Sequence, residues 1–524
     1  MIKDSKGKTK VIVIGLDGAD WKVLKPLIET NELPFLRKLL TNGAYGSLES
    51  IYPPLSVPAW RCYSSGKYPS KIGVFSFMKF DRRSKKFKVV NSKDFRTLDI
   101  WDYLGIYGYK VCVYKMFSTH PAKKVNGIMI SDLPIYKNAF YPTYLKRELE
   151  TKFGKLMFDI AFTTDRVKTY RGVLKEIAKD IQILLYLIKK FNPDFVHISI
   201  AHTDGIQHFF WADMLSKNSP YKHYIKYAWK IVDKLLETLV SKLKVIWKDK
   251  NIYIVLMSDH GFTAVRYHFN IGDWLIEKGY LRLRIKGFFL RALFNFLDFE
   301  KTYTIIELLL KFLRKIGIKQ AKWGLQFNIK AQTFSDLIDF KKSLIIPLDP
   351  QQWYINPEYY HNENQRIAIF TKIKEELSKI LTPEGDKAIW RVIDGKKLYN
   401  GRGNPPDIII LSKGIDLSTM IYSSRRWIKQ KSGKWSGMHD LYGIFLISGP
   451  GIKKSFEIKK ARIIDIAPTI MYLFNIPIPS SMDGKVLYEA FENLFLKSKP
   501  KAHIVSDKHF IKLLLKKRLK RLFR

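Results

Sequence analysis

Short, continuously apolar runs that are rich in β-branched residues recur along this chain, and helical patterns separate them. Runs of this kind are typical of strands that are buried on both faces of a parallel sheet. Strands that alternate with helices predict an α/β fold, with a largely parallel central sheet and helices on both of its faces. We expect strands at 10–15, 111–114, 195–200, 252–257, 407–411 and 443–447, and the main helices at 173–191, 224–243, 366–381 and 464–474.

The alternation is interrupted by a stretch from about residue 281 to residue 330 that is rich in Leu, Phe, Ile, Lys and Arg. This stretch predicts one or two amphipathic helices inserted into the α/β pattern. A cap over the active site is the preferred interpretation, and a plain structural insertion is the alternative. With 524 residues the chain has room for such an addition to a large core. The predicted domains are a catalytic core at 1–280 and 400–480, an inserted cap region at 281–400 and a basic C-terminal tail helix at 481–524.

Basic residues outnumber acidic ones by 91 to 48, which gives a net charge of +43. A field of this sign attracts phosphate esters, nucleic acid and the anionic face of a bilayer. A lysine-biased proteome is an equally good explanation, because the lysines are spread along the whole chain. The charge therefore narrows the class of partner without identifying it.

The sequence has no feature of a secreted or membrane-spanning protein. Its N-terminus is polar, and no apolar run approaches the roughly 18–20 residues that a spanning helix needs. Cys62 and Cys112 lie in unrelated segments, which argues against a disulfide framework and against a thiolate zinc site. We expect a cytoplasmic protein that is at most peripheral to a membrane.

The C-terminal segment 509–524 carries seven Lys or Arg among its sixteen residues. Ile511, Leu515, Leu519 and Leu522 repeat at helical spacing, which predicts an apolar stripe flanked by basic side chains. Such a helix can lie in the headgroup region of an anionic membrane. The alternative is a terminal helix that packs its stripe on its own domain.

Seven residues with metal-binding or nucleophilic side chains follow predicted strands, open helix-like segments or lie in glycine-bordered loops. In sheets of the predicted kind, sites collect beyond the carboxyl ends of the strands, and three of the carboxylates lie within a few residues of such an end. We therefore expect a shared site. The seven residues are Asp17, Ser56, Asp204, His208, Asp259, His260 and His439.

Local spacing supports metal binding by two of these segments. Asp204 and His208 are four residues apart, so on a helix they project from one face and can chelate one ion. Asp259 and His260 follow a predicted strand, and a turn at Gly261 can direct both side chains to one ion. Both segments therefore offer paired ligands.

Ser56 precedes a predicted helix, and Pro58 suits the first turn of that helix. The amides and the partial positive charge of a helix N-terminus favour an alkoxide and a bound phosphate. Two interpretations of Ser56 stay open on this ground alone. It is either a nucleophile or an ordinary N-cap residue.

The five segments that carry these residues, in this order, resemble the alkaline phosphatase superfamily. The resemblance is strongest to its type I phosphodiesterase/nucleotide pyrophosphatase branch, of the archaeal and bacterial kind, and runs from about residue 10 to about residue 475. It implies an alkaline phosphatase-like fold and two divalent metal ions, zinc or alternatively manganese. One ion would be held by Asp204, His208 and His439, and the second by Asp17, Asp259 and His260. The resemblance also implies that Ser56 attacks the phosphate and that a phosphoseryl intermediate is then hydrolysed.

Two departures from the branch concern the substrate. The branch usually has threonine where this chain has Ser56, which leaves the preference for monoesters or diesters open. It also usually has an asparagine after the nucleophile helix, and Phe77 lies near that place here. Lys67, Ser76 and Lys79 are the candidates to bind the substrate instead, so nucleotides are not the expected substrate.

The sequence therefore predicts a metal-dependent phosphohydrolase, with a phosphodiesterase acting on a small or lipid-linked phosphate ester as the leading hypothesis. A phosphomonoesterase or a phosphomutase on the same fold is the alternative, and a sulfatase is disfavoured because Trp60 stands where that chemistry needs arginine. A basic nucleic-acid or membrane binding protein with a vestigial site is the hypothesis from another class. All six ligand positions carry competent ligands and no nucleic-acid-binding module is present, so nucleic acid is not an expected partner.

Overall fold

The computed structural model describes residues 8–81, 84, 86–132, 137–156, 165–296, 337–419, 427–431 and 435–522. Packing divides the chain into two units. The core unit comprises Met1–Gly73, Asn91–Ala264 and Lys434–Arg524, and the inserted unit comprises Val74–Val90 and Val265–Gly433.

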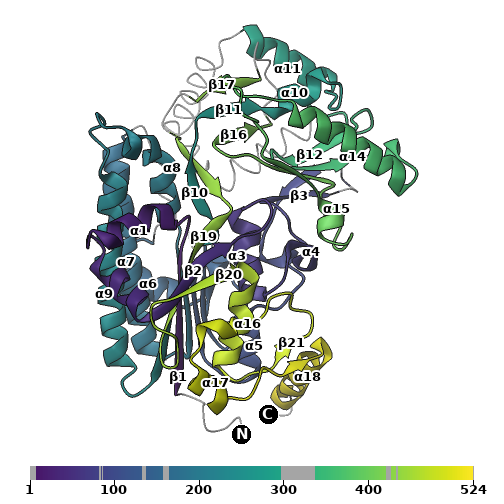
Figure 1. The fold of residues 1–524 in the computed structure, drawn as a ribbon. Helices are drawn as coiled ribbons and strands as arrows, with labels where there is room; N and C mark the ends of the chain where they lie inside the picture. Colours follow the sequence, from purple (N-terminus) through teal and green to yellow (C-terminus); the bar gives the residue numbers. More distant parts are fainter. Residues whose placement is uncertain are drawn as a thin grey trace. The chain divides into compact units, whose positions relative to one another are not determined.

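A sheet of nine described strands forms the centre of the core unit, in the order β20-β2-β19-β9-β1-β8-β5-β6-β7 (Figure 1). Strand β1 is parallel to β8 and β9, and β5 is parallel to β8 and β6, so the sheet is largely parallel as predicted. Strand β19 is antiparallel to both of its neighbours, β2 and β9. The strands are β1 (Thr9–Leu16), β2 (Gly43–Glu49), β5 (Val111–Met116), β6 (Gly127–Ser131), β7 (Phe140–Tyr141), β8 (Phe195–Ile200), β9 (Asn251–Met257), β19 (Tyr442–Ser448) and β20 (Phe456–Arg462).

All eight residues of strand β1 are buried, which shows that the sheet is covered on both faces. Ile12, Ile14 and Leu16 belong to one large apolar core, which α1 (Trp21–Glu29), α2 (Pro34–Thr41), α7 (Arg166–Phe191), α8 (His202–Leu215) and α9 (Tyr224–Ile246) complete. Alternate residues of a strand point to opposite faces. Gly15 therefore faces the other side, where a Cβ atom would lie 2.2 Å from the indole of Trp60.

The helices of that second face include α3 (Ser56–Ser65), α5 (Ile100–Ile106) and α16 (Ile466–Leu473), and Figure 1 shows them across the sheet from α1, α7 and α9. Every residue of α3 is buried. Because Asp17 has the same parity as Gly15 along β1, its side chain is directed to the α3 side of the sheet. The alternation of side chains along β1 therefore places the Asp17 carboxylate on the same side of the sheet as α3.

The inserted unit has its own sheets. One has the order β12-β13-β15-β14, another has the order β16-β11-β17, and β3 and β4 form a further two-stranded sheet. The predicted strand at 407–411 forms as β15, yet it belongs to the first of these sheets and not to the central sheet. The main elements are β3 (Met78–Asp81), β4 (Lys86–Val89), β11 (Tyr267–Asn270), α10 (Ile271–Glu277), α11 (Ile285–Phe296), β12 (Ile345–Asp349), β13 (Gln352–Ile355), α14 (Glu363–Ser378), β14 (Arg391–Asp394), α15 (Gly395–Leu398), β15 (Ile408–Leu411), β16 (Ile415–Ser418) and β17 (Ile428–Gln430).

These boundaries differ from the predicted insertion at 281–400. The unit also takes in 74–90, because Phe80 and Phe87 of the β3–β4 hairpin pack on Phe340. Of the predicted amphipathic helices, α11 is described, and the segment around 305–314 lies outside the described residues. The cap interpretation stays a prediction.

The segment 481–524 belongs to the core unit and is not a separate tail. Strand β22 (Ile504–Val505) pairs with β21 (Ile478–Pro479), and helix α18 (Asp507–Leu522) packs Phe510 against Tyr103 of α5. Within the described part of the chain, none of the helices has the length and apolar character required to span a bilayer.

Candidate metal centre

The predicted ligands converge at the carboxyl edge of the central sheet because of strand register. Gly15 of β1 lies opposite Met257 of β9. Asp17 follows Gly15 by two residues, and Asp259 follows Met257 by two residues. Helix α8 begins directly after β8 and carries Asp204 and His208. The last ligand arrives through a short antiparallel pair, in which Phe262 of β10 (Gly261–Ala264) lies opposite His439 of β18 (Gly437–Asp440). That pair brings together two segments that are far apart in the sequence.

Asp204, His208 and His439 form the first group of ligand atoms. The Oδ1 atom of Asp204 lies 3.3 Å from Nε2 of His208 and 3.4 Å from Nε2 of His439, and the two Nε2 atoms are 3.2 Å apart. Ligand atoms that surround a zinc ion tetrahedrally at about 2.0–2.1 Å lie about 3.3 Å from one another. The three atoms therefore have the spacing of ligands to one ion. Burial alone would raise the pKa of Asp204, but the two imidazoles beside it hold that pKa well below its usual range.

Asp17, Asp259 and His260 form the second group, and all three side chains are buried. The Nε2 atom of His260 lies 3.5 Å from Oδ1 of Asp17 and 3.3 Å from Oδ2 of Asp259. Burial and the neighbouring carboxylate raise the pKa of Asp17 well above its usual range, and burial raises the pKa of Asp259 to about 6. Burial also lowers the pKa of His260 well below its usual range. Without an added cation, burial therefore favours a neutral imidazole at His260 and opposes negative charge on the two carboxyl groups.

His260 lies between the two groups. Its ring stacks on that of His439 with centroids 3.6 Å apart, and a second possible ligand set joins it to Asp204 and His439. The structure thus brings together all six predicted ligands. The division of six ligands between two ions stays a prediction.

Unpaired oxygens support metal binding. Asp17 Oδ1, Asp204 Oδ1 and Asp259 Oδ2 are buried and have no hydrogen-bond partner within the described residues. An uncompensated buried carboxylate costs several kcal/mol, and the raised pKa values of Asp17 and Asp259 show this cost. No lysine or arginine contacts any of the three oxygens among the described ion pairs. Divalent cations would supply the missing charge, so the residues present fit such ions.

The histidine tautomers point to the same conclusion. Each imidazole directs Nδ1 at a backbone carbonyl oxygen, that of Gly437 for His208, Pro54 for His439 and Gly261 for His260, at 2.6, 3.0 and 3.0 Å. A carbonyl only accepts, so in each neutral ring the proton is on Nδ1 and the lone pair is on Nε2. Two Nε2 lone pairs that face each other across 3.2 Å, as in His208 and His439, repel unless a metal ion or a proton lies between them. Histidine ligands of metal ions typically donate their other ring N–H to a backbone carbonyl or a carboxylate, and the three Nδ1 atoms are placed to do so.

Ser56 is the first residue of α3 and Leu55 is its N-cap, so the side chain of Ser56 does not cap the helix. The predicted helix start was late by about one residue, and the ordinary N-cap interpretation is wrong. The Oγ atom of Ser56 lies 3.3 Å from Nε2 of His260. A hydroxyl at this place has both the helix N-terminus and the second ligand group beside it.

Two residues that contact the predicted ligands were missed by the sequence analysis. The ring of Trp435 stacks on His208 with centroids 3.8 Å apart, and Trp60 directs its indole N–H at Asp17 from 3.4 Å. Trp435 precedes the predicted ligand His439 by four residues, so an aromatic residue close to a ligand motif was the one signal available. Stacking on a residue more than two hundred positions away leaves no local pattern.

The three predicted substrate-binding residues have other described contacts. Lys67 is buried in the core unit, and its ammonium group lies 3.9 Å from Asp507. Ser76 and Lys79 belong to the inserted unit, where Ser76 donates a hydrogen bond to Asp349 and Lys79 lies in β3. Their role in substrate binding stays a prediction.

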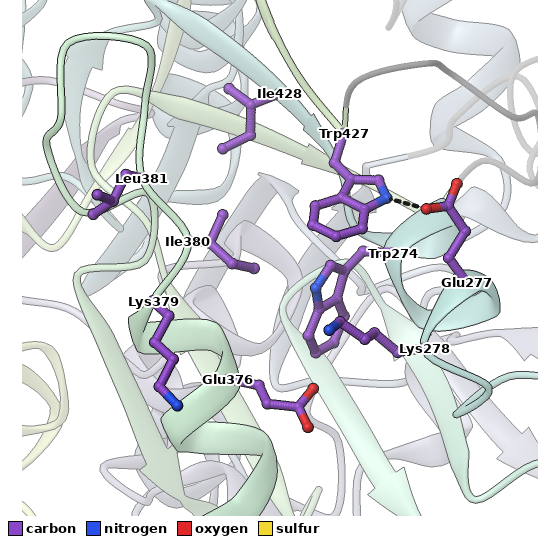
Figure 2. A pocket seen from close by; sticks show the side chains of 9 residues that line it. All are labelled: Trp274, Glu277, Lys278, Glu376, Lys379, Ile380, Leu381, Trp427 and Ile428. Carbon is purple, nitrogen blue, oxygen red and sulfur yellow. Dashed lines mark hydrogen bonds between the residues drawn. The ribbon is translucent and has the colours of Figure 1, made fainter.

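The inserted unit has a cavity of about 650 Å³, which Figure 2 shows from close by. None of the predicted site residues lines it, and two of the side chains around it have hydrogen-bond partners. Trp427 donates its indole N–H to Glu277 at 2.8 Å, and Glu376 accepts from Tyr280 at 2.8 Å. The lining residues are Trp274, Glu277, Lys278, Glu376, Lys379, Ile380, Leu381, Trp427 and Ile428.

Comparison with known proteins agrees with the geometry of the core unit. The sequence profile of the type I phosphodiesterase/nucleotide pyrophosphatase family matches residues 11–405. The chain belongs to this family. It is accordingly a hydrolase of phosphoric ester bonds of the phosphodiesterase/nucleotide pyrophosphatase kind, and the family is metal-dependent. No curated protein matches the sequence.

Solved structures of ectonucleotide pyrophosphatase/phosphodiesterase 5 have the same fold. The human protein shares 14% identity at a TM-score of 0.52, with 92% of this chain and 98% of that chain covered. The murine protein shares 13% identity at a TM-score of 0.53, with 92% and 100% covered. An inactive murine variant in complex with AMP shares 12% identity at a TM-score of 0.51, with 92% and 98% covered. These similarities confirm the predicted fold class.

Proposed function

We propose that this chain is a two-metal phosphodiesterase that cleaves its substrate through a phosphoseryl intermediate on Ser56. The single observation that supports this most directly is the position of Ser56 Oγ, 3.3 Å from His260 Nε2 and at the first residue of a ten-residue helix. The six ligands around it suit zinc, with manganese as the alternative. The proposed substrate is a small or lipid-linked phosphate diester.

Each part of the site has a separate task in this proposal. The Ser56 hydroxyl gives up its proton to water, and Oγ attacks the phosphorus atom in line. A bond from Oγ to phosphorus forms, the bond to the leaving alcohol oxygen breaks, and that oxygen takes up a proton from water. The first-turn amides of α3 stabilise negative charge on the hydroxyl oxygen and on the bound phosphate. Water then cleaves the serine–phosphate bond and restores the hydroxyl. Bound divalent ions supply Lewis-acid stabilisation of the phosphate oxygens and lower the pKa of a bound hydroxyl or water.

A phosphomonoesterase is the second candidate, and a specific observation favours keeping it. This chain has serine where the branch usually has threonine. Comparing turnover of 4-nitrophenyl phosphate with that of bis-(4-nitrophenyl) phosphate distinguishes the two activities. Because a murine structural relative was solved with AMP, nucleotides belong in the same substrate panel.

The nucleophile is tested with Ser56→Ala in protein loaded with zinc or manganese. We expect turnover of bis-(4-nitrophenyl) phosphate to fall by more than about a thousandfold, because no other hydroxyl replaces a covalent nucleophile. Ser65→Ala is the matched control, since Ser65 is a buried serine of the same helix that donates to the carbonyl of Arg61. Metal content and thermal unfolding of both variants should match the wild type. Turnover retained by Ser56→Ala would exclude the phosphoseryl mechanism.

A further inference from the structure

Helix α18 turns its apolar stripe away from the unit that carries it. Ile511, Leu515 and Leu519 are spaced four residues apart, which places them along one face of the helix. Their exposed fractions are 54%, 53% and 53%. A helix that packed this stripe on its own domain would bury it, so that interpretation of the C-terminal segment is wrong.

A different face of α18 attaches the helix to the core unit. Phe510 is 1% exposed and packs edge to face on Tyr103 of α5, with ring centroids 4.8 Å apart. Farther along the helix, Lys517 donates to the backbone carbonyl of Gly105 at 3.0 Å. Tyr107 completes the contact with a hydrogen bond of 2.9 Å to His509. These contacts hold the helix along the unit and leave the stripe facing outward.

The outward surface of α18 is also cationic. Lys508, Lys512 and Lys516 are exposed and follow the same four-residue spacing, so a basic row runs beside the apolar one. The acidic residue of the helix, Asp507, is already compensated, because it accepts from Ser481 at 2.6 Å and lies 3.9 Å from Lys67. An apolar row bordered by lysines matches a surface with an apolar interior and an anionic rim.

We propose that α18 docks this protein on an anionic lipid bilayer, with Ile511, Leu515 and Leu519 inserted at the boundary of headgroups and acyl chains. The lysines beside them would place their ammonium groups among the lipid phosphates while their methylene stems cover apolar surface. Nucleic acid offers the same negative charge but gains nothing from exposed Ile and Leu side chains. The proposal does not rest on the catalytic residues, so it stands or falls independently of the proposed function.

The test is cosedimentation of the full chain with two kinds of vesicle, phosphatidylcholine alone and phosphatidylcholine mixed with phosphatidylglycerol. We expect the wild type to bind the anionic vesicles and to stay in solution with the neutral ones. Ile511→Ser combined with Leu515→Ser should weaken binding by about tenfold or more, since apolar burial is lost. Lys512→Glu combined with Lys516→Glu should weaken it by about 30-fold or more.

Matched controls change the same chemistry elsewhere in the core unit. Leu215→Ser with Val245→Ser alters two side chains that are 64% and 75% exposed, and Lys242→Glu with Lys244→Glu reverses two exposed lysines of α9. Both control pairs should bind like the wild type, and all variants should unfold at the wild-type temperature.

Three outcomes would overturn the proposal. Wild type that stays in solution with anionic vesicles excludes docking on lipid. Control pairs that lose as much binding as the α18 pairs show that α18 has no special role. A serine pair that binds like the wild type shows a purely electrostatic contact, and the exposed stripe then belongs to a protein partner.

Discussion

Each unit of this protein contains a buried cluster of acidic groups, and the two clusters differ in where their positive charge comes from. In the inserted unit, the guanidinium of Arg366 is 1% exposed and lies 2.7 Å from Asp394 and 3.5 Å from Asp407. In the core unit, Asp17, Asp204 and Asp259 have only imidazoles beside the oxygens that lack hydrogen-bond partners. In a cluster with its own cation, the fold itself supplies the positive charge. A cluster without one stores an electrostatic deficit that a metal ion can remove.

Metal removal should have the largest effect of these changes, and it should act on the activity of the core unit. Dialysis against a chelator should reduce hydrolysis of bis-(4-nitrophenyl) phosphate by at least about a hundredfold, because the ligands can no longer stabilise charge on the phosphate. Added zinc or manganese should restore it, and the metal-loaded protein should unfold at a higher temperature. Full activity in protein that metal analysis shows to be free of zinc and manganese would contradict the assignment of the cluster.

Arg366→Met should have the largest effect on stability. It leaves Asp394 without this cation and Asp407 with Lys396 alone, and breaking a buried pair in this way costs about 3–5 kcal/mol of unfolding free energy. Denaturant unfolding measures the change. Arg402→Met is the control, because Arg402 is exposed, and it should change the free energy by less than about 0.5 kcal/mol.

In metal-free protein, Asp17→Asn should increase the unfolding free energy, whereas Arg366→Met should decrease it. Burial and the neighbouring Asp259 raise the pKa of Asp17 well above its usual range, so the carboxyl group opposes folding at neutral pH. We expect its neutralisation to raise the unfolding free energy of the metal-free form by about 1–2 kcal/mol, while the metal-loaded form loses activity.

The matched control for that change is Asp99→Asn in the same unit. Asp99 is fully buried, but it lies 3.1 Å from Arg61 and 2.8 Å from Lys123. Here the substitution removes a paired charge, so the unfolding free energy should fall. Equal signs for the two substitutions would show that a missing cation does not distinguish the clusters.

Trp435→Ala should produce the smallest of these effects. Removing the ring that stacks on His208 loosens the orientation of one ligand, which typically weakens metal binding by about tenfold. Titration of metal-free protein with zinc measures this change. Trp390→Ala, at a tryptophan of the inserted unit that is 52% exposed, should leave zinc affinity unchanged.

The strands and the ligands were predictable for local reasons. A run such as 252–257 is continuously apolar and includes β-branched residues, and β9 matches it to within one residue, because a strand that is covered on both faces needs mostly apolar side chains. The carboxylates after β1 and β9 were predicted to meet because the carboxyl ends of parallel strands share one edge. Neither inference requires knowledge of a distant contact.

Strand partners and unit boundaries were less predictable. The runs at 407–411 and 443–447 both form strands, but one joins the sheet of the inserted unit and the other enters the central sheet antiparallel to its neighbours. An apolar run shows that a segment is buried in a sheet without showing which sheet or in which direction. The hairpin at 78–89 joined the inserted unit through aromatic contacts with Phe340, which lies some 250 positions away.

The sequence by itself determined the α/β layering, the family and the six candidate ligand residues, because each follows from periodicity or from a motif a few residues long. Only the tertiary structure decided which atoms face one another. It set the Nδ1 atoms of three histidines against backbone carbonyls, stacked Trp435 on His208 and turned the apolar row of α18 outward. These features depend on distances between segments that the chain order does not encode locally, and burial and charge become decisive only when those segments meet.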